Sequence, residues 1–230
     1  MTPKILSDNV ILVTGAANGL GAAVAKAYAA EGATVVLLDK DVPGLEKTYD
    51  AIATSSEQPA IYPLDLKGAG IKDYADLANN IESHFGRLDG LVHCAAMLGQ
   101  LAPIEHQDPI TWSETLHVNL TAPFLLTKAC LPLLKKQQQG VIIFTTDDHK
   151  DKAYWAGYGV SKAGIEALAK QLADELETED RIQVHCIEPG QIQTALFSRA
   201  FPAIAPHHLP HPDEAVSPYL SAMINTNSTG

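Results

Sequence analysis

The chain has 230 residues, of which 46% are hydrophobic and 19% are charged, as in an ordinary globular protein. Its formal net charge of −11 argues against nucleic acid or an anionic membrane surface as a partner, because both select basic faces. We find no N-terminal signal pattern and no apolar stretch of membrane-spanning length, so we expect a cytoplasmic protein. Cys94, Cys130 and Cys186 each lie in an apolar segment, and we expect three free, buried thiols.

The N-terminal part predicts a strand, a glycine-rich turn, a helix and a second strand. Residues 10–13 are an apolar run, the turn reaches Gly21, and Gly32 ends an alanine-rich helix. Residues 34–38 predict the second strand, and Asp39 stands at its end. Glycines let a pyrophosphate approach the backbone, and the first helical turn offers it N–H groups. An acid in this place accepts hydrogen bonds from ribose hydroxyls and repels a 2′-phosphate, so Asp39 predicts NAD rather than NADP.

Predicted strands and helices alternate along the rest of the chain. Further strands are expected over 60–63, 88–94, 141–145 and 182–187, and helices over 43–53, 71–85, 109–136, 155–177 and 213–223. Pro123 is expected to kink the third of these helices close to Asn119. The alternation predicts a single α/β domain over residues 1–230, with a doubly wound parallel sheet (a Rossmann fold) and helices on both faces.

Tyr158 and Lys162 are one helical turn apart near the start of the helix expected over 155–177. A phenol has a pKa of about 10, and a neighbouring ammonium lowers that pKa by stabilising the phenolate. Such a pair can give a proton to a carbonyl oxygen, or take one from an alcohol, while a hydride moves. Alone, this spacing more often reflects a core tyrosine and a surface lysine. The glycine turn upstream favours the chemical interpretation.

Five motifs, in this order, resemble those of the short-chain dehydrogenase/reductase family. They are Thr14-Gly15-x-x-x-Gly19-x-Gly21, Asp65, Val118-Asn119-Leu120, Tyr158-x-x-x-Lys162 and Pro189-Gly190-x-Ile192-x-Thr194. The resemblance implies a cofactor site made of Gly15, Asn18, Gly19, Leu20, Gly21, Asp39, Asp65, Leu66, Ala95, Tyr158, Lys162, Pro189, Gly190 and Ile192. The implied cofactor is NAD, with NADP less expected although Lys40 adjoins Asp39 and can accommodate a 2′-phosphate.

The same resemblance implies the chemistry. Tyr158 would be the general acid/base, Lys162 would bind the nicotinamide ribose, and Asn119 would help to hold a water that relays protons towards Lys162. The implied reaction is reversible hydride transfer between NAD(H) and a ketone or secondary alcohol, in a homodimer or homotetramer. The segment of about 191–216 would form the substrate loop. We expect no metal site there, because the histidines of this segment lack partners at ligand spacing.

Another residue stands where the family has its catalytic serine. Counting back from Tyr158 reaches Thr145, whereas counting along the fifth strand reaches Asp147, with Thr146 beside it. We favour the strand as the anchor, because its buried face fixes its register. An ionised Asp147 would repel the oxygen that becomes negative during carbonyl reduction, unless burial raises its pKa and lets it donate a proton. We therefore expect slow carbonyl reduction. The alternative is an impaired NAD(P)-binding scaffold that acts as a sensor or binds a partner.

Two further departures concern the cofactor and the sheet. His93-Cys94-Ala95-Ala96 stands where the family usually has Asn-Asn-Ala-Gly, and the methyl group of Ala96 is expected to weaken cofactor binding. The run Ser228-Thr229-Gly230 resembles the one before the family's seventh strand, but that strand is absent from the sequence. We expect either a six-stranded sheet or a partner that covers its edge.

Overall fold

Six parallel strands form one sheet in the computed structural model, which describes residues 4–54, 58–177 and 181–224. The strands are β1 (Val10–Thr14), β2 (Thr34–Asp39), β3 (Ala60–Pro63), β4 (Gly90–His93), β5 (Gly140–Thr145) and β6 (Ile182–Ile187). Their order in the sheet is β3-β2-β1-β4-β5-β6, and every neighbouring pair is parallel. The predicted doubly wound parallel sheet is confirmed, with a fourth strand shorter than the expected 88–94.

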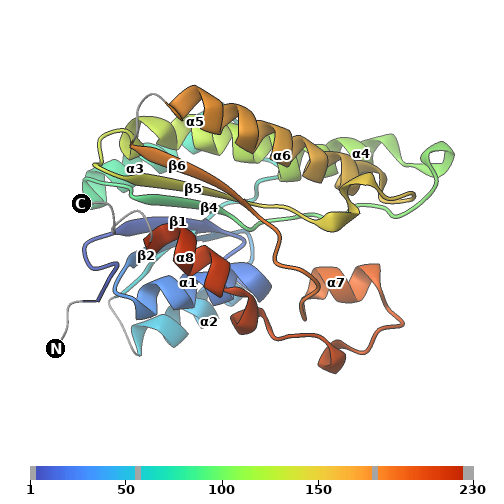
Figure 1. Cartoon of the computed structure of the whole chain (residues 1–230), viewed down its shortest axis with the longest axis horizontal. Coiled ribbons are helices and arrows are strands. Elements are labelled where there is room, and N and C mark those ends of the chain that lie inside the picture. Colours follow the sequence, from blue (N-terminus) through green and yellow to red (C-terminus); the bar gives the residue numbers. More distant parts are fainter. Residues whose placement is uncertain (1–3, 55–57, 178–180, 225–230) are drawn as a thin grey trace.

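Helices cover both faces of the sheet (Figure 1). One layer holds α3 (Ile71–Phe85), α5 (Ala122–Leu134) and α6 (Ala156–Leu176), and the other holds α1 (Gly19–Ala30), α2 (Val42–Ala53) and α8 (Ser217–Ile224). Val10 and Leu12 of β1 pack in the core beneath the first layer, whereas Ile11 and Val13 pack in the core beneath the second. Side chains alternate along a strand, so a strand covered on both faces is apolar throughout.

The helix expected over 109–136 is divided in the structure. It consists of α4 (Pro109–Leu116), a π-helical turn (His117–Thr121) and α5. Proline has no N–H, so Pro123 cannot bond to the carbonyl group four residues before it, which is that of Asn119. In the π-helical turn, the N–H of Ala122 bonds to the carbonyl of His117, five residues back. The interruption therefore falls where the sequence places the kink, and Asn119 lies inside it.

The segment after β6 is more ordered than the expected loop. It contains α7 (Ala195–Ala200) and two short 3-10 turns (Pro206–His208 and Pro212–Ala215), and α8 begins at Ser217. Thr194 starts α7, because its Oγ1 accepts a hydrogen bond from the N–H of Phe197 at 3.1 Å. Figure 1 shows α7 beyond the end of the sheet, apart from both helical layers.

The three cysteines are free, but they differ in exposure. Cys130 is buried, Cys94 is half-buried and Cys186 is exposed. The prediction of a buried thiol is therefore wrong for Cys186. It lies on β6, one of the two edge strands of the described sheet, where residues are less covered than on the central strands.

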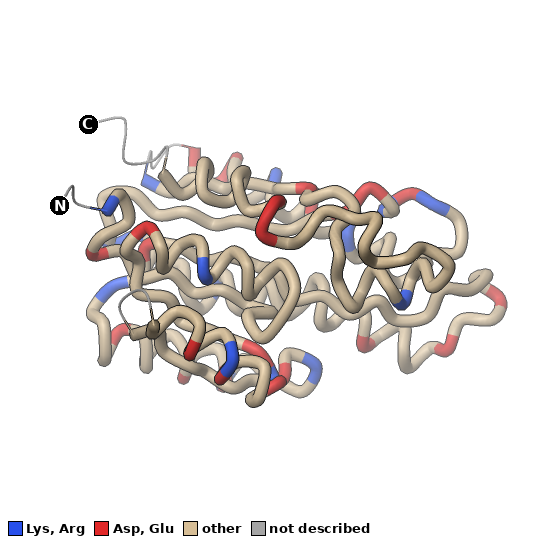
Figure 2. The backbone as a smooth tube through the Cα atoms, turned by 90° about the horizontal axis from the view of Figure 1, so that it is seen from below, with Lys and Arg blue, Asp and Glu red and all other residues tan. Residues whose placement is uncertain are grey.

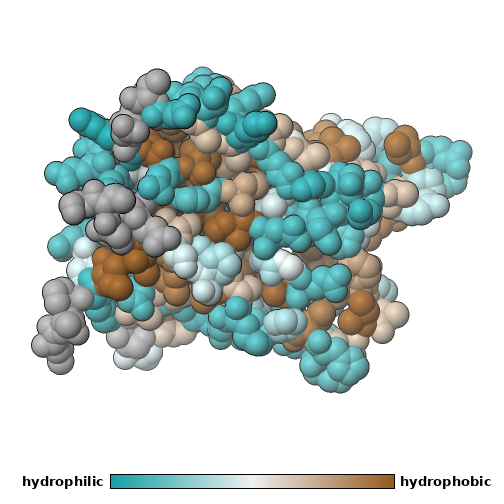
Figure 3. Space-filling model, in the orientation of Figure 1, coloured by the Kyte–Doolittle hydropathy of each residue, from teal (hydrophilic) through white to brown (hydrophobic). Residues whose placement is uncertain are grey.

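Charged and apolar groups are mixed over the surface. Figure 2 shows Asp and Glu interspersed with Lys and Arg along the backbone, and Figure 3 shows hydrophobic patches separated by hydrophilic side chains on one face. Within the described residues, no helix is both long and apolar enough to cross a membrane. The run Ser228-Thr229-Gly230 lies outside the described residues.

Candidate active site

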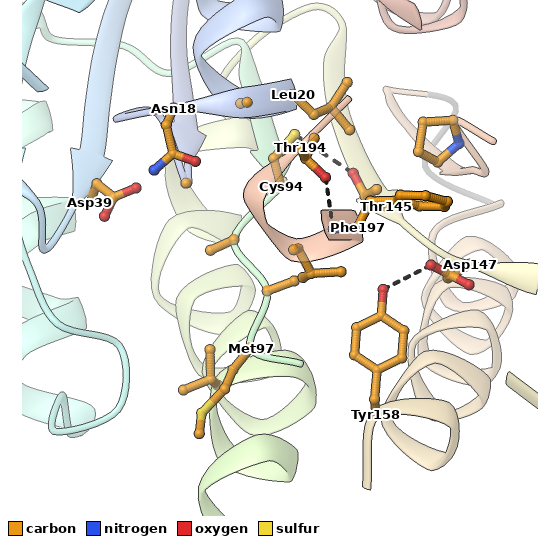
Figure 4. A pocket seen from close by; sticks show the side chains of 18 of the residues that line it. Asn18, Leu20, Asp39, Cys94, Met97, Thr145, Asp147, Tyr158, Thr194 and Phe197 are labelled. Carbon is orange, nitrogen blue, oxygen red and sulfur yellow. Dashed lines mark hydrogen bonds between the residues drawn. The ribbon is translucent and has the colours of Figure 1, made fainter. Parts of the chain in front are cut away.

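A cavity of about 370 Å³ lies along the carboxyl ends of the strands. It brings together every cofactor-binding residue that the sequence predicted: Gly15, Asn18, Gly19, Leu20, Gly21, Asp39, Asp65, Leu66, Ala95, Tyr158, Lys162, Pro189, Gly190 and Ile192. Thr146 and Asp147 also line it, but Asn119 does not. Figure 4 shows Asn18 and Asp39 at one end of the cavity and Tyr158 and Asp147 at the other.

Two glycines of the turn lie where a side chain would collide with the protein backbone. Gly15 adopts a left-handed backbone conformation with φ of 71°, and a Cβ on it would lie 2.8 Å from the nitrogen of Ala95. A Cβ on Gly21 would lie only 2.2 Å from the carbonyl oxygen of Gly15. The side chain of Asn18 does not cap α1, and the first turn of an uncapped helix is a site for anions. These residues fit the pyrophosphate of a dinucleotide.

Asp39 is held by the backbone at the other side of this turn. Its Oδ2 accepts a hydrogen bond from the N–H of Ala17 at 3.3 Å, and its Oδ1 accepts one from the N–H of Asp41 at 3.1 Å. Lys40 lines the same cavity. A carboxylate and an ammonium group are therefore both present where an adenosine ribose would lie.

Tyr158 is 3% exposed, and its hydroxyl donates a hydrogen bond to Oδ2 of Asp147 at 2.8 Å (Figure 4). Burial and the negative charge of Asp147 raise the pKa of Tyr158. The sequence predicted the opposite direction, from Lys162 alone. That prediction is wrong, because burial and a carboxylate in direct contact with the hydroxyl both disfavour its ionisation to the phenolate.

Lys162 is buried beneath the tyrosine. Its Nζ lies 5.6 Å from the centre of the Tyr158 ring and donates a hydrogen bond to the carbonyl oxygen of Thr145 at 2.8 Å. Burial lowers the pKa of Lys162, and the charge of Asp147 opposes that shift. The ammonium group is thus tied to the end of β5 while it faces the catalytic end of the cavity.

Among the three candidates for the serine position, Asp147 is the one that contacts Tyr158. Oγ1 of Thr145 lies 2.9 Å from the hydroxyl of Tyr219, and Oγ1 of Thr146 donates to Glu166 at 2.9 Å. Both threonine hydroxyls therefore have partners away from Tyr158.

The carboxyl group of Asp147 is an acceptor. Burial opposes its ionisation, but hydrogen bonds from the backbone and ring of His149 and from Tyr158 outweigh burial, so the pKa of Asp147 is lowered. The alternative in which burial raises this pKa and makes Asp147 a proton donor is therefore wrong.

Asn119 holds the loop after β4 against α6. Its Nδ2 donates to the carbonyl oxygen of Met97 at 2.9 Å and to Oγ of Ser161 at 3.0 Å, and its Oδ1 accepts the N–H of Met97 at 2.7 Å. All of these partners are protein groups, and they give the side chain a positioning role. The water-holding role implied by the resemblance stays a prediction.

A family model described as short chain dehydrogenase matches residues 9–204. The chain belongs to the short-chain dehydrogenase/reductase family. It is 37% identical to the oxidoreductase YciK of Escherichia coli over 222 residues, which is 95% of this chain and 87% of YciK.

Solved structures of short-chain dehydrogenases superpose closely on the chain. One from Pseudomonas syringae has a TM-score of 0.93 and 42% identity, covering 96% of this chain and 91% of its own. Another, from Shigella flexneri and complexed with NADP, has a TM-score of 0.93 and 36% identity, and the match covers 96% of this chain and 93% of the Shigella flexneri chain.

In this short-chain dehydrogenase/reductase, the sequence did not predict His149, which contacts Asp147. Nδ1 of His149 lies 2.6 Å from Oδ1 of Asp147, and its ring stacks on Trp155 with 3.9 Å between centroids. Phe201, which follows α7, packs against both rings. The signal was a histidine two residues after the acid, and it becomes informative only once Asp147 is known to face Tyr158.

Proposed function

We propose that this protein transfers a hydride between a nicotinamide dinucleotide and a carbonyl or alcohol substrate. The observation that carries the proposal is the cavity that joins the glycine turn at one end to Tyr158 and Lys162 at the other. The dinucleotide supplies or accepts the hydride when bound. Tyr158 would contact the reacting oxygen, and Lys162 would hold the ribose. Leu196 and Phe197 line the same cavity, which favours apolar substituents on the substrate.

The choice of cofactor rests on two opposing observations. Asp39, with both carboxylate oxygens held at the end of β2, supports NAD(H). The Shigella flexneri neighbour is complexed with NADP, which favours NADP(H) for this chain, and Lys40 is a basic residue next to Asp39. Parallel titrations with NADH and NADPH, monitored by protein fluorescence and thermal shift, decide between the two cofactors. Tighter binding of NADH than of NADPH, with this difference lost in Asp39→Asn, supports Asp39 as the residue that determines cofactor preference. Tighter binding of NADPH than of NADH contradicts this role of Asp39.

The test of the reaction is oxidation of the bound reduced cofactor by a panel of ketones, with the reverse reaction on secondary alcohols. We expect Tyr158→Phe to keep cofactor affinity and to lose turnover, because it removes one oxygen and leaves the ring in place. Equal turnover in wild type and Tyr158→Phe would contradict the role of the hydroxyl.

One observation favours a second candidate, a cofactor-binding sensor or scaffold. Asp147 accepts the proton of Tyr158 that carbonyl reduction needs. Cofactor binding without hydride transfer to any substrate in wild type, together with a large gain of ketone turnover in Asp147→Ser, would support this candidate.

A further inference from the structure

We propose that the preferred substrate is a protonated imine, which this site would reduce to an amine in preference to reducing a ketone. The inference rests on the proposed hydride transfer and names the class of atom that lies against Tyr158 and Asp147. It follows from which hydrogen-bonding groups remain available at the catalytic end of the cavity.

The hydroxyl of Tyr158 has one proton, and that proton is committed to Asp147. The donor–acceptor distance is 2.8 Å, and Asp147 is held by its other oxygen, Oδ1, which accepts the N–H of His149 at 2.9 Å and its ring Nδ1 at 2.6 Å. A hydroxyl oxygen can accept as well as donate, and a carboxylate oxygen has a second lone pair. An incoming substrate therefore meets two acceptors, which call for a donor on the reacting atom.

The charges around this pair favour a positive substrate. Asp147 has a side chain that is 26% exposed, so it is shielded from most solvent. Nδ1 of His149 also lies 2.9 Å from Asp148, which adds a second carboxylate to the same loop. The buried ammonium of Lys162 donates to the backbone of β5 rather than to Asp147. The pKa of Asp147 is lowered, so its carboxylate is ionised at neutral pH.

These groups treat the two reactions differently. When a ketone accepts a hydride, negative charge develops on oxygen. The site would place that oxygen against the carboxylate of Asp147, which already holds the proton of the Tyr158 hydroxyl. A protonated imine brings its own proton. The hydride adds to the imine carbon, the C=N electron pair moves to nitrogen, and a neutral amine forms without any proton transfer in that step. A carboxylate beside the nitrogen also favours the protonated imine, which is the form that accepts hydride.

The test compares matched substrates in matched variants. A cyclic ketimine, methylpyrroline, and the corresponding methylcyclopentanone are each offered at neutral pH with the reduced cofactor that binds more tightly. In wild type, kcat/KM is expected to be higher for the imine. In Asp147→Ser, the ratio of kcat/KM for the imine to kcat/KM for the ketone is expected to fall by about tenfold or more, because one full charge next to the reacting atom is removed. Asp148→Asn removes a charge from the same loop without touching Tyr158, and it is expected to lower the ratio by less than the Asp147 variants do.

Asp147→Asn, which keeps the size of the side chain, gives a second measurement if Asp147→Ser does not fold, and it is expected to lose the preference too. Wild-type turnover of the ketone above that of the imine would overturn the inference and leave the proposed function standing. An unchanged ratio in both Asp147 variants would also overturn it. So would a wild type that reduces neither substrate while Asp147→Ser reduces the ketone. Bound cofactor with no hydride transfer to either substrate in any variant would overturn the inference and the proposed function together.

Discussion

His93 makes the stability of the fold depend on pH in a way that can be calculated. Its imidazole lies 2.9 Å from Oγ1 of Thr127 and stacks on Phe144 with 4.8 Å between ring centroids. Burial lowers the pKa of His93 to about 3, whereas in the unfolded chain it is about 6.5. Below pH 6.5 the unfolded chain therefore binds a proton that the folded protein does not. The stability contribution is present above pH 6.5 and is lost as the pH falls towards 3.

The size of the loss follows from the linkage relation. Each pH unit between the two pKa values costs about 1.36 kcal/mol, so His93 alone is expected to lower the free energy of unfolding by about 3 kcal/mol at pH 4.5. The variant His93→Gln has no proton to gain, and its amide can still bond to Thr127. Carboxyl groups titrate in both proteins, so the difference between them isolates His93.

The assay is urea unfolding of both proteins at pH 7.5 and pH 4.5, followed by tryptophan fluorescence. When the pH is lowered, the free energy of unfolding is expected to fall by about 3 kcal/mol less in His93→Gln than in wild type, whatever the substitution costs at pH 7.5. Parallel losses of stability in the two proteins would refute the reasoning, because they would mean that His93 titrates alike in the folded and unfolded states.

Three more predictions concern other parts of the structure. Gly21→Ala is expected to abolish cofactor binding in a fluorescence titration, since its Cβ would lie 2.2 Å from a carbonyl oxygen, whereas Gly68→Ala, with nothing within 4 Å, is the control that keeps binding. Asn119→Ala removes three hydrogen bonds and is expected to cost about 2–4 kcal/mol in urea unfolding; a loss within experimental error would contradict its positioning role. A thiol reagent is expected to label Cys186 in the native protein, because it is exposed, and to label Cys130 only after unfolding, because burial raises the pKa of Cys130 to about 12. Rapid labelling that persists in Cys186→Ser would contradict this assignment.

Much of the fold was predictable because its four central strands are buried on both faces. The apolar runs of β1 and β2 indicate such strands directly, and the amphipathic spacing of α3 indicates one buried helix face. Pro123 predicted where a helix is interrupted, but not that the interruption is a π-helical turn, since that depends on how α4 and α5 pack. The six-residue helix α7 was missed, because it is too short to show a period.

In the candidate active site too, features that are local in the sequence were predictable, and features that depend on distant contacts were not. The glycine turn and the Tyr158 and Lys162 pair are local patterns, and the sequence placed all of them in one cavity. The direction of the pKa shift of Tyr158 was not accessible, because it depends on a contact of 2.8 Å across eleven residues of chain. The exposure of Cys186 depends on which strand lies at the edge of the sheet, and the position of a strand in the sheet is not a local pattern.

The contact between Tyr158 and Asp147 separates the presence of a motif from the chemistry that the motif performs. With a neutral residue in place of Asp147, the buried ammonium of Lys162 would be the main charge near the phenol and would favour its ionisation. The carboxylate of Asp147 lies in hydrogen-bond contact with the hydroxyl, whereas Nζ of Lys162 lies 5.6 Å from the centre of the ring. The carboxylate accepts the proton that an incoming carbonyl oxygen would need. An unchanged Tyr158 and Lys162 pair can therefore serve a different reacting atom, and the residue that decides which atom it is lies outside the pair.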